Sequence, residues 1–168
     1  MPFPGEWIMS IDKARTHLEK VGFTDRIMEF EQSSATVELA ALAVGCEPAR
    51  IAKTLSFHIG DRVALILFAG DVRIDNRKFK DRFHTKAKML HADEAEPLIG
   101  HRVGGVCPFG VNDCCDVYLD ASLRRFDIVY PAAGTAASAV RLSIEELECA
   151  CAPCEWVDVS KLPEPAAE

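Results

Sequence analysis

Apolar and polar positions along the chain alternate between helical and strand spacing at short intervals. Helical spacing begins after Ser10, which can cap the helix, and ends at Gly22. Further helix starts are predicted at Thr36, Asp75, Asp93 and Ser143. The last two are each followed three residues later by a glutamate, which is the spacing of a capping box.

Strand-like segments lie between these helices. They are Thr54–Ile59, Val63–Ala69, Val117–Ala121, Ile128–Tyr130, Val140–Leu142 and Trp156–Val159. The first two are separated by Gly60-Asp61-Arg62, which is typical of a hairpin. Val63–Ala69 is apolar without alternation, which indicates a strand covered on both faces. The pattern therefore predicts a mixed α/β or α+β fold with at least one antiparallel pair.

Composition places the chain among ordinary globular proteins. Of its 168 residues, 49% are hydrophobic and 27% charged, and the net charge is −7, which excludes a disordered chain and argues against a nucleic-acid coat protein. The longest apolar run is far shorter than the ~20 residues of a membrane helix, so a membrane is not an expected partner. The negative net charge means that DNA is not an expected partner either. The first residues lack the pattern of a secretory signal, and the seven cysteines fit reduced thiols. We expect a cytoplasmic, single-domain protein over residues 1–168, with a core of about 10–160 and loose ends.

Positive charge is concentrated in one segment. Residues 73–88 contain seven basic and two acidic side chains, for a local net charge of +5. Such a segment can bind phosphates, although a solvated helix face has the same pattern.

Lys53 precedes the first predicted strand. If the strand already includes this residue, the period of two places the ammonium on the same face as Leu55 and Phe57. A charge there is costly unless it is paired or opens into a cleft. The alternative is a strand that begins one residue later, with Lys53 reaching into water.

A glycine-rich loop runs from Gly104 to Gly110. Gly104 and Gly105 allow close approach of the backbone to a ligand, Pro108 fixes the turn, and Phe109 offers a ring on which a base can stack. The loop matches neither a P-loop nor the dinucleotide-binding fingerprint. A tight surface turn with a core phenylalanine is the alternative.

Other chemistry-bearing residues form no strong motif. The cysteines at 149, 151 and 154 with the adjacent pair at 114 and 115 provide only one knuckle of a zinc site, so buried thiols are favoured and a zinc protein is the weakest hypothesis. No metal or cofactor is expected. No G-x-S-x-G motif occurs, and Asp120 either lines the pocket of Lys53 or faces solvent.

In combination, these segments carry a resemblance. The order Ile51-Ala-Lys53-Thr-Leu, Ala69-Gly-Asp71, Gly104-Gly-Val-Cys-Pro108 and Tyr118-Leu-Asp120 resembles the YbaK/prolyl-tRNA-synthetase-associated editing-domain family over roughly residues 10 to 160. Neither the lysine motif nor the G-x-x-x-P loop is specific for this family alone, but the two together are.

The resemblance implies a fold, a site and a reaction. The fold would be a curled, barrel-like mixed sheet surrounded by helices. Lys53 would be the active-site lysine, and Gly104, Gly105 and Pro108 would hold the tRNA acceptor end. The activity would be trans-editing: hydrolysis of a small amino acid, alanine or cysteine, from mischarged tRNA, with proline tRNA favoured. Aminoacyl-tRNA is the expected partner, with a prolyl-tRNA synthetase as a second candidate. The alternative is a non-catalytic module of the same fold that binds the acceptor end or a synthetase.

Overall fold

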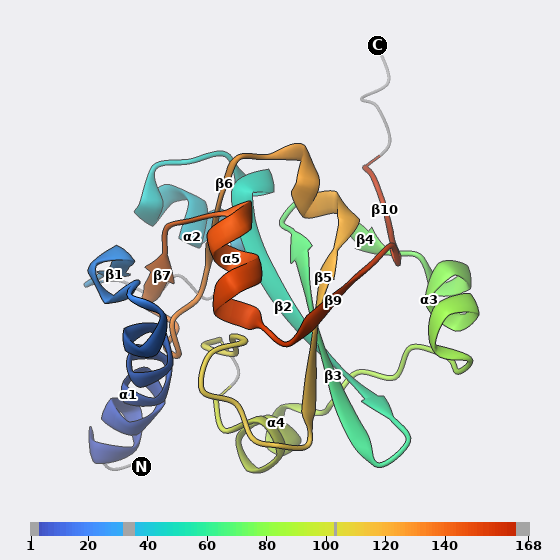
Figure 1. Ribbon diagram of the computed structural model, residues 1–168, viewed down its shortest axis with the longest axis horizontal. Helices are drawn as coiled ribbons and strands as arrows, with labels where there is room; N and C mark the ends of the chain where they lie inside the picture. The colour runs from blue at the N-terminus through green and yellow to red at the C-terminus, as the bar shows by residue number, and fades with distance from the viewer. Residues whose placement is uncertain (1–3, 32–35, 103, 164–168) are drawn as a thin grey trace.

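The computed structural model describes residues 4–31, 36–102 and 104–163, with side chains from residue 12 onward (Figure 1). The helices are α1 (Pro4–Val21), α2 (Val37–Val44), α3 (Asn76–Phe83), α4 (Ala92–Ile99) and α5 (Ile144–Cys151), with 3-10 turns η1 (Thr24–Arg26), η2 (Pro48–Arg50) and η3 (Ala121–Arg125). The strands are β1 (Ile27–Glu29), β2 (Ile51–Ile59), β3 (Arg62–Ala69), β4 (Arg73–Ile74), β5 (Cys115–Asp120), β6 (Ile128–Pro131), β7 (Ser138–Val140), β8 (Leu142–Ser143), β9 (Cys154–Val157) and β10 (Ser160–Lys161).

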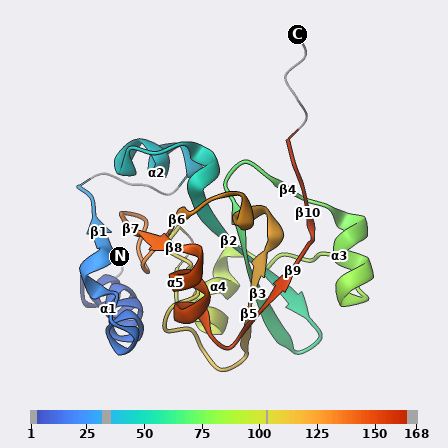
Figure 2. The ribbon, with the colours of Figure 1, turned by 45° about the horizontal axis from the view of Figure 1, so that its top comes forward.

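A six-stranded mixed sheet forms the centre of the molecule. Its order is β8-β6-β2-β3-β5-β9, in which β2 and β3 form an antiparallel hairpin and the pairs β3–β5, β5–β9 and β2–β6 are parallel. The sheet curls into a half-barrel, and helices surround it: α5 crosses its front in Figure 1, with α3 and α4 at other sides. Turning the molecule brings α2 forward above the start of β2 (Figure 2). The expected α+β class with a curled mixed sheet is confirmed.

Strand β3 lies at the middle of this sheet and is buried along its length. Its residues 63–69 are at most 2% exposed, because β2 and β5 flank the strand and the core covers both faces. The prediction of a strand covered on both sides is confirmed. So is the hairpin, whose turn is formed by Gly60 and Asp61.

Local capping signals located most helix starts correctly. The side chains of Thr36, Asp75 and Ser143 accept hydrogen bonds from the first turns of α2, α3 and α5. Two expectations were wrong. Helix α1 begins at Pro4, a residue favoured in a first turn, and not after Ser10. Helix α4 is capped by His91 with Glu94, two residues before the predicted Asp93. No helix of the described chain is long and apolar enough to cross a membrane.

Strand boundaries differ where pairing is non-local. Strand β2 begins three residues earlier than predicted, at Ile51, because β6 pairs with its start. The predicted strand Val140–Leu142 is two strands: β7 pairs with β1, and β8 pairs with β6. The short pairs β1–β7 and β4–β10 join segments far apart in sequence. The strands β1, β4 and β10 had no local signal and were not predicted.

Asp120 neither lines the pocket of Lys53 nor faces solvent. Its carboxylate is fully buried and accepts hydrogen bonds from Ser122 N–H (2.9 Å), Val159 N–H (2.9 Å) and the Ser160 hydroxyl (2.6 Å). The Asp120 carboxylate therefore links the end of β5, through hydrogen bonds, to the segment that enters β10.

Replacing Asp120 with alanine is expected to destabilise the protein by about 3 kcal/mol or more, because three buried donors lose their acceptor. Urea unfolding measures the change. Asp158→Ala, which removes an exposed carboxylate paired with Lys78 at the surface, is the control and is expected to cost less than about 1 kcal/mol. Equal effects of the two substitutions would contradict a structural role for Asp120.

Candidate active site

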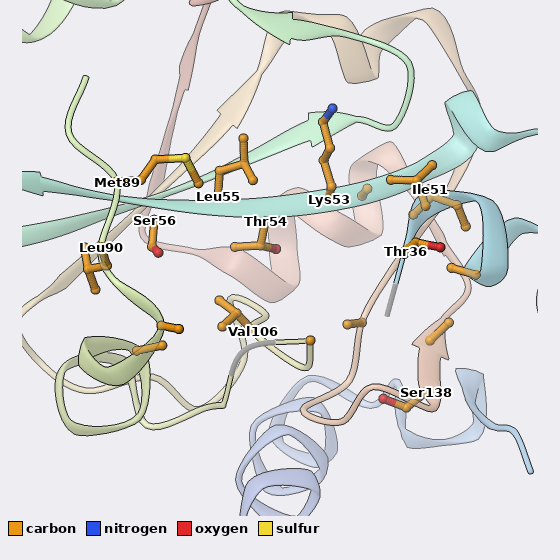
Figure 3. Close-up of a pocket in the computed structure, with 18 of the residues that line it drawn as sticks. Thr36, Ile51, Lys53, Thr54, Leu55, Ser56, Met89, Leu90, Val106 and Ser138 are labelled. Atoms are coloured by element: carbon orange, nitrogen blue, oxygen red, sulfur yellow. The ribbon is translucent and has the colours of Figure 1, made fainter. Parts of the chain in front are cut away.

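A cavity of about 470 Å³ lies beside β2 (Figure 3). Six consecutive residues of that strand, 51–56, line it. The rest of the lining comes from α2, from the segment 89–95, from Gly104 and Val106 of the glycine-rich loop, and from four residues around β6 and β7: Tyr130, Ala132, Ser138 and Ala139. The volume and the mixture of apolar walls with few polar groups are typical of a small-ligand site.

Lys53 is part of the cavity lining and lies within β2. The strand includes residue 53, so the side chain shares a face with Leu55 and not with Thr54 (Figure 3). The alternative of a later strand start is therefore wrong. The Lys53 ammonium is partly buried and donates to the carbonyl oxygens of Val72 (2.5 Å) and Gly70 (3.5 Å). The turn that follows β3 thus holds the end of the lysine in place.

The charge of Lys53 is not neutralised by a direct ion pair with any described residue. The nearby Asp71 is engaged by Arg125, whose guanidinium contacts both carboxylate oxygens (2.5 and 3.1 Å) and lowers the pKa of Asp71. Burial lowers the pKa of Lys53 from 10.5, against the opposing influence of Asp71. An ammonium held by carbonyl dipoles can therefore attract an anion or a developing negative charge.

The glycine-rich loop contributes to the same cavity through its first residue. Gly104, in the left-handed region at φ 94°, lines the cavity together with Lys53. Gly105 and Pro108 are buried behind this wall and are not among the cavity residues. Phe109 is fully buried in the core, so its ring is not available for stacking with a base. Among the predicted site residues, Lys53 and Gly104 are the two that line the cavity, although the Lys53 side chain lies on the opposite side of β2 from Val106 of the glycine-rich loop (Figure 3).

The opposite face of β2 holds residues that the sequence analysis missed. Thr54 and Ser56 point toward Val106, on the side away from Lys53 (Figure 3). The hydroxyl oxygen of Thr54 is buried and has no hydrogen-bond partner among the described residues. The polar alternation of Thr54, Ser56 and His58 was the available signal, since it marks a strand face that is not packed in the core.

The thiol of Cys107 lies beside a histidine but has the environment of a buried, inert group. Cys107 Sγ lies 3.5 Å from Nε2 of His101, but the thiol is fully buried and burial raises its pKa to about 12. The histidine donates to the Phe109 carbonyl (2.6 Å), so the pair supports the loop. Within residues 4–31, 36–102 and 104–163, no three His, Cys, Asp or Glu side chains cluster as metal ligands would.

The basic segment ends, in sequence, directly before residues that line the cavity. Lys78 and Arg82 of α3 pair with the acidic residues Asp158 and Glu155. Five further basic side chains are exposed without an ion-pair partner among the described residues: Arg73, Arg77, Lys80, Lys86 and Lys88. The chain continues directly from Lys88 into cavity residues 89 and 90, so this end of the basic segment adjoins the cavity lining.

Comparison with known proteins gives a consistent set of relatives. A family model described as the aminoacyl-tRNA editing domain matches residues 31–149. The uncharacterized protein YwhH of Bacillus subtilis (strain 168) is 47% identical over 91% of this chain and 98% of its own. The proline–tRNA ligase of Caldicellulosiruptor bescii is 27% identical over 53% of this chain, which corresponds to only 15% of the ligase.

A solved structure supports the same relationship. The crystal structure of a candidate trans-editing enzyme for prolyl tRNA synthetase matches with a TM-score of 0.82 and 29% identity, covering 96% of this chain and 99% of the other. The shared architecture therefore extends over nearly the entire length of both proteins.

Proposed function

The chain belongs to the aminoacyl-tRNA editing domain family, and from this membership we propose that it is a trans-editing deacylase. It hydrolyses the ester of a small amino acid, alanine or cysteine, mischarged onto tRNA, with proline tRNA as the favoured acceptor. The observation that carries the proposal is that Lys53 and Gly104 line one cavity, and that the Lys53 ammonium has no carboxylate paired with it in the described chain.

The reaction needs little from the protein beyond placement and charge. An aminoacyl ester is activated, so a bound water can add to the ester carbon and lose its proton to solvent. The bond between this carbon and the ribose oxygen then breaks, and the ribose oxygen takes a proton. Lys53 stabilises negative charge, either on the ester oxygen during addition or on the terminal phosphate. No protein nucleophile is required, in keeping with the buried and protonated Cys107.

A small amino acid is the expected target because synthetase pockets discriminate poorly against smaller apolar side chains. A missing methylene changes binding by only ~1–3 kcal/mol, so errors must be removed at a second site. The relatives that are proline–tRNA ligases, and the solved relative described as acting for prolyl tRNA synthetase, favour proline tRNA as the acceptor.

The exposed basic side chains between Arg73 and Lys88 are placed to bind RNA phosphates. The last of them, Lys88, directly precedes cavity residues 89 and 90, and the rest of the chain is acidic. A tRNA whose terminal ester occupies the cavity would bring its acceptor stem over this segment. Binding should therefore weaken as salt concentration rises. The cytoplasm is the matching location, and a prolyl-tRNA synthetase is a candidate partner for delivery of the tRNA.

A deacylation panel tests the proposal. Purified protein is incubated with proline tRNA charged with alanine, cysteine, serine or proline, and loss of the ester is followed. We expect alanyl or cysteinyl esters to be hydrolysed well above the buffer rate while Pro-tRNA is spared. If no ester is lost faster than in buffer, the enzymatic proposal is wrong, and salt-sensitive binding without turnover would identify the non-catalytic module instead.

A further inference from the structure

The outer edge of β2 is interrupted at Thr54. Odd-numbered residues of this strand bond to β3, and even-numbered residues face outward, as shown by the bonds from His58 N–H to Lys88 O (2.8 Å) and from Leu90 N–H to Ser56 O (3.1 Å). At the other end, β6 pairs only with Ile51 and Ala52. No described residue bonds to the outward N–H or C=O of Thr54 between these two partners.

The cavity follows this open edge. Residues 51–56 all line it, although alternate side chains of a strand point to opposite faces. A single cavity can touch all six only if it runs along the edge of the strand, with Lys53 on one side and Thr54 on the other (Figure 3). Unpaired strand edges are avoided in proteins because they bind extended chains, so an open edge inside a cavity is an available binding element.

We propose that the aminoacyl group of the substrate pairs with Thr54 as a one-residue antiparallel strand. This inference rests on the proposed editing function. An aminoacyl ester carries a nitrogen and a carbonyl on one α-carbon, like a residue of a peptide. Its α-ammonium donates to the Thr54 carbonyl, and its ester carbonyl accepts from the Thr54 N–H, which is the reciprocal exchange of a hydrogen-bonded antiparallel pair.

The pairing determines where the rest of the substrate lies. Residues directly opposite each other in an antiparallel pair place their side chains on the same face. An L-amino acid therefore directs its side chain toward the Thr54 face, where the buried hydroxyl of Thr54 and the apolar Val106 lie. The Thr54 N–H becomes a donor to the oxygen on which charge develops when water adds. Lys53 remains on the other side of the edge, toward the acceptor end.

Recognition of the α-ammonium distinguishes aminoacyl esters from other acyl esters. An acyl group without the amine would leave the Thr54 carbonyl buried and unpaired. Loss of a charged hydrogen bond should weaken binding about 10- to 100-fold. The substrate class is therefore α-amino acyl esters, and simple carboxylic acyl esters are excluded.

Competitive inhibition tests this inference. Two short acceptor-stem RNAs are compared, one ending in a 3′-alanylamido and one in a 3′-propionylamido adenosine; neither can be hydrolysed as an ester. We expect the alanyl RNA to inhibit alanyl-tRNA hydrolysis about 10- to 100-fold more strongly. Equal inhibition, or none by either RNA, would overturn the pairing while the observed hydrolysis upholds the proposed function. Absence of hydrolysis in the uninhibited reaction would overturn the proposed function itself and, with it, the pairing.

Thr54→Val separates the backbone from the side-chain hydroxyl. The variant keeps the shape of residue 54 and its N–H and C=O, so the preference for the alanyl RNA should persist. Its loss would assign the preference to the hydroxyl and overturn the backbone pairing.

Amide hydrogen exchange tests directly whether the N–H of Thr54 is unpaired in the free protein and paired in the complex. In the free protein, the N–H of Thr54 should exchange faster than that of Leu55, which bonds to β3. Addition of the alanyl RNA should slow exchange of the Thr54 N–H at least 10-fold more than exchange of the Leu55 N–H, which is the matched control. Equal slowing of both amides, or none at Thr54, would overturn the proposal.

Discussion

Lys53→Met is expected to lower kcat/KM for the mischarged tRNA by at least about 100-fold, because it removes the ammonium that faces the reacting ester or its phosphate. The free energy of unfolding should change by only about 1 kcal/mol. The methionine relieves the cost of a partly buried charge, while the carbonyls of Val72 and Gly70 lose their donor. Deacylation kinetics and urea unfolding measure the two effects.

The pH dependence of Lys53→Met tests whether its loss of activity comes from the missing positive charge. Burial lowers the pKa of Lys53 below 10.5. The ratio of wild-type to Lys53→Met rates should therefore fall as pH rises through the lowered pKa, where the ammonium loses its proton. The folded chain then holds fewer protons than the unfolded chain, so wild-type stability should rise with pH in this window relative to the variant.

Lys161→Met is the matched control, because it removes the same charge from an exposed position outside the cavity. It should leave the kinetic constants unchanged. A Lys53→Met enzyme that deacylates as fast as the wild type would contradict a catalytic role for Lys53.

Local chemistry made much of the fold predictable. Thr36, Asp75 and Ser143 each satisfy N–H groups within their own helix, and the Gly60-Asp61 turn joins neighbouring strands. Such signals need no knowledge of distant residues. The strands β1, β4 and β10 exist only because segments far away in sequence pair with them, so the pattern could not reveal them.

The site was partly predictable for the same reason. Lys53 was singled out by its motif and Gly104 by its loop, and both line the cavity. The open edge at Thr54 was not, since it arises where the pairing of β6 stops after Ala52 and that of residues 88–90 begins at Ser56. Phe109 suggested a stacking surface in sequence, whereas tertiary packing placed it in the core.

Gly105→Ala is expected to reduce kcat/KM by about 100-fold and to destabilise the protein by about 1–3 kcal/mol. A Cβ at this position would lie 2.6 Å from the Gly134 carbonyl oxygen and 2.7 Å from Cα of Thr135. Both contacts are backbone atoms and cannot rotate away. The hydroxyl of Ser138 also fixes this backbone by accepting from Ala133 N–H (3.1 Å) and Thr135 N–H (3.3 Å).

The substitution should therefore act through the walls of the cavity. Gly104 lies on one wall and Ser138 on another, and the added methyl group forces the segments that carry them apart. Gly60→Ala is the control, because residue 60 also turns the chain, at φ 61°, but its Cβ would meet no atom within 4 Å. It should cost about 1 kcal/mol of stability through backbone strain and leave kcat/KM intact. If Gly105→Ala lowered stability as Gly60→Ala does and spared activity, the close contact between the glycine-rich loop and residues 134–135 would not be what shapes the site.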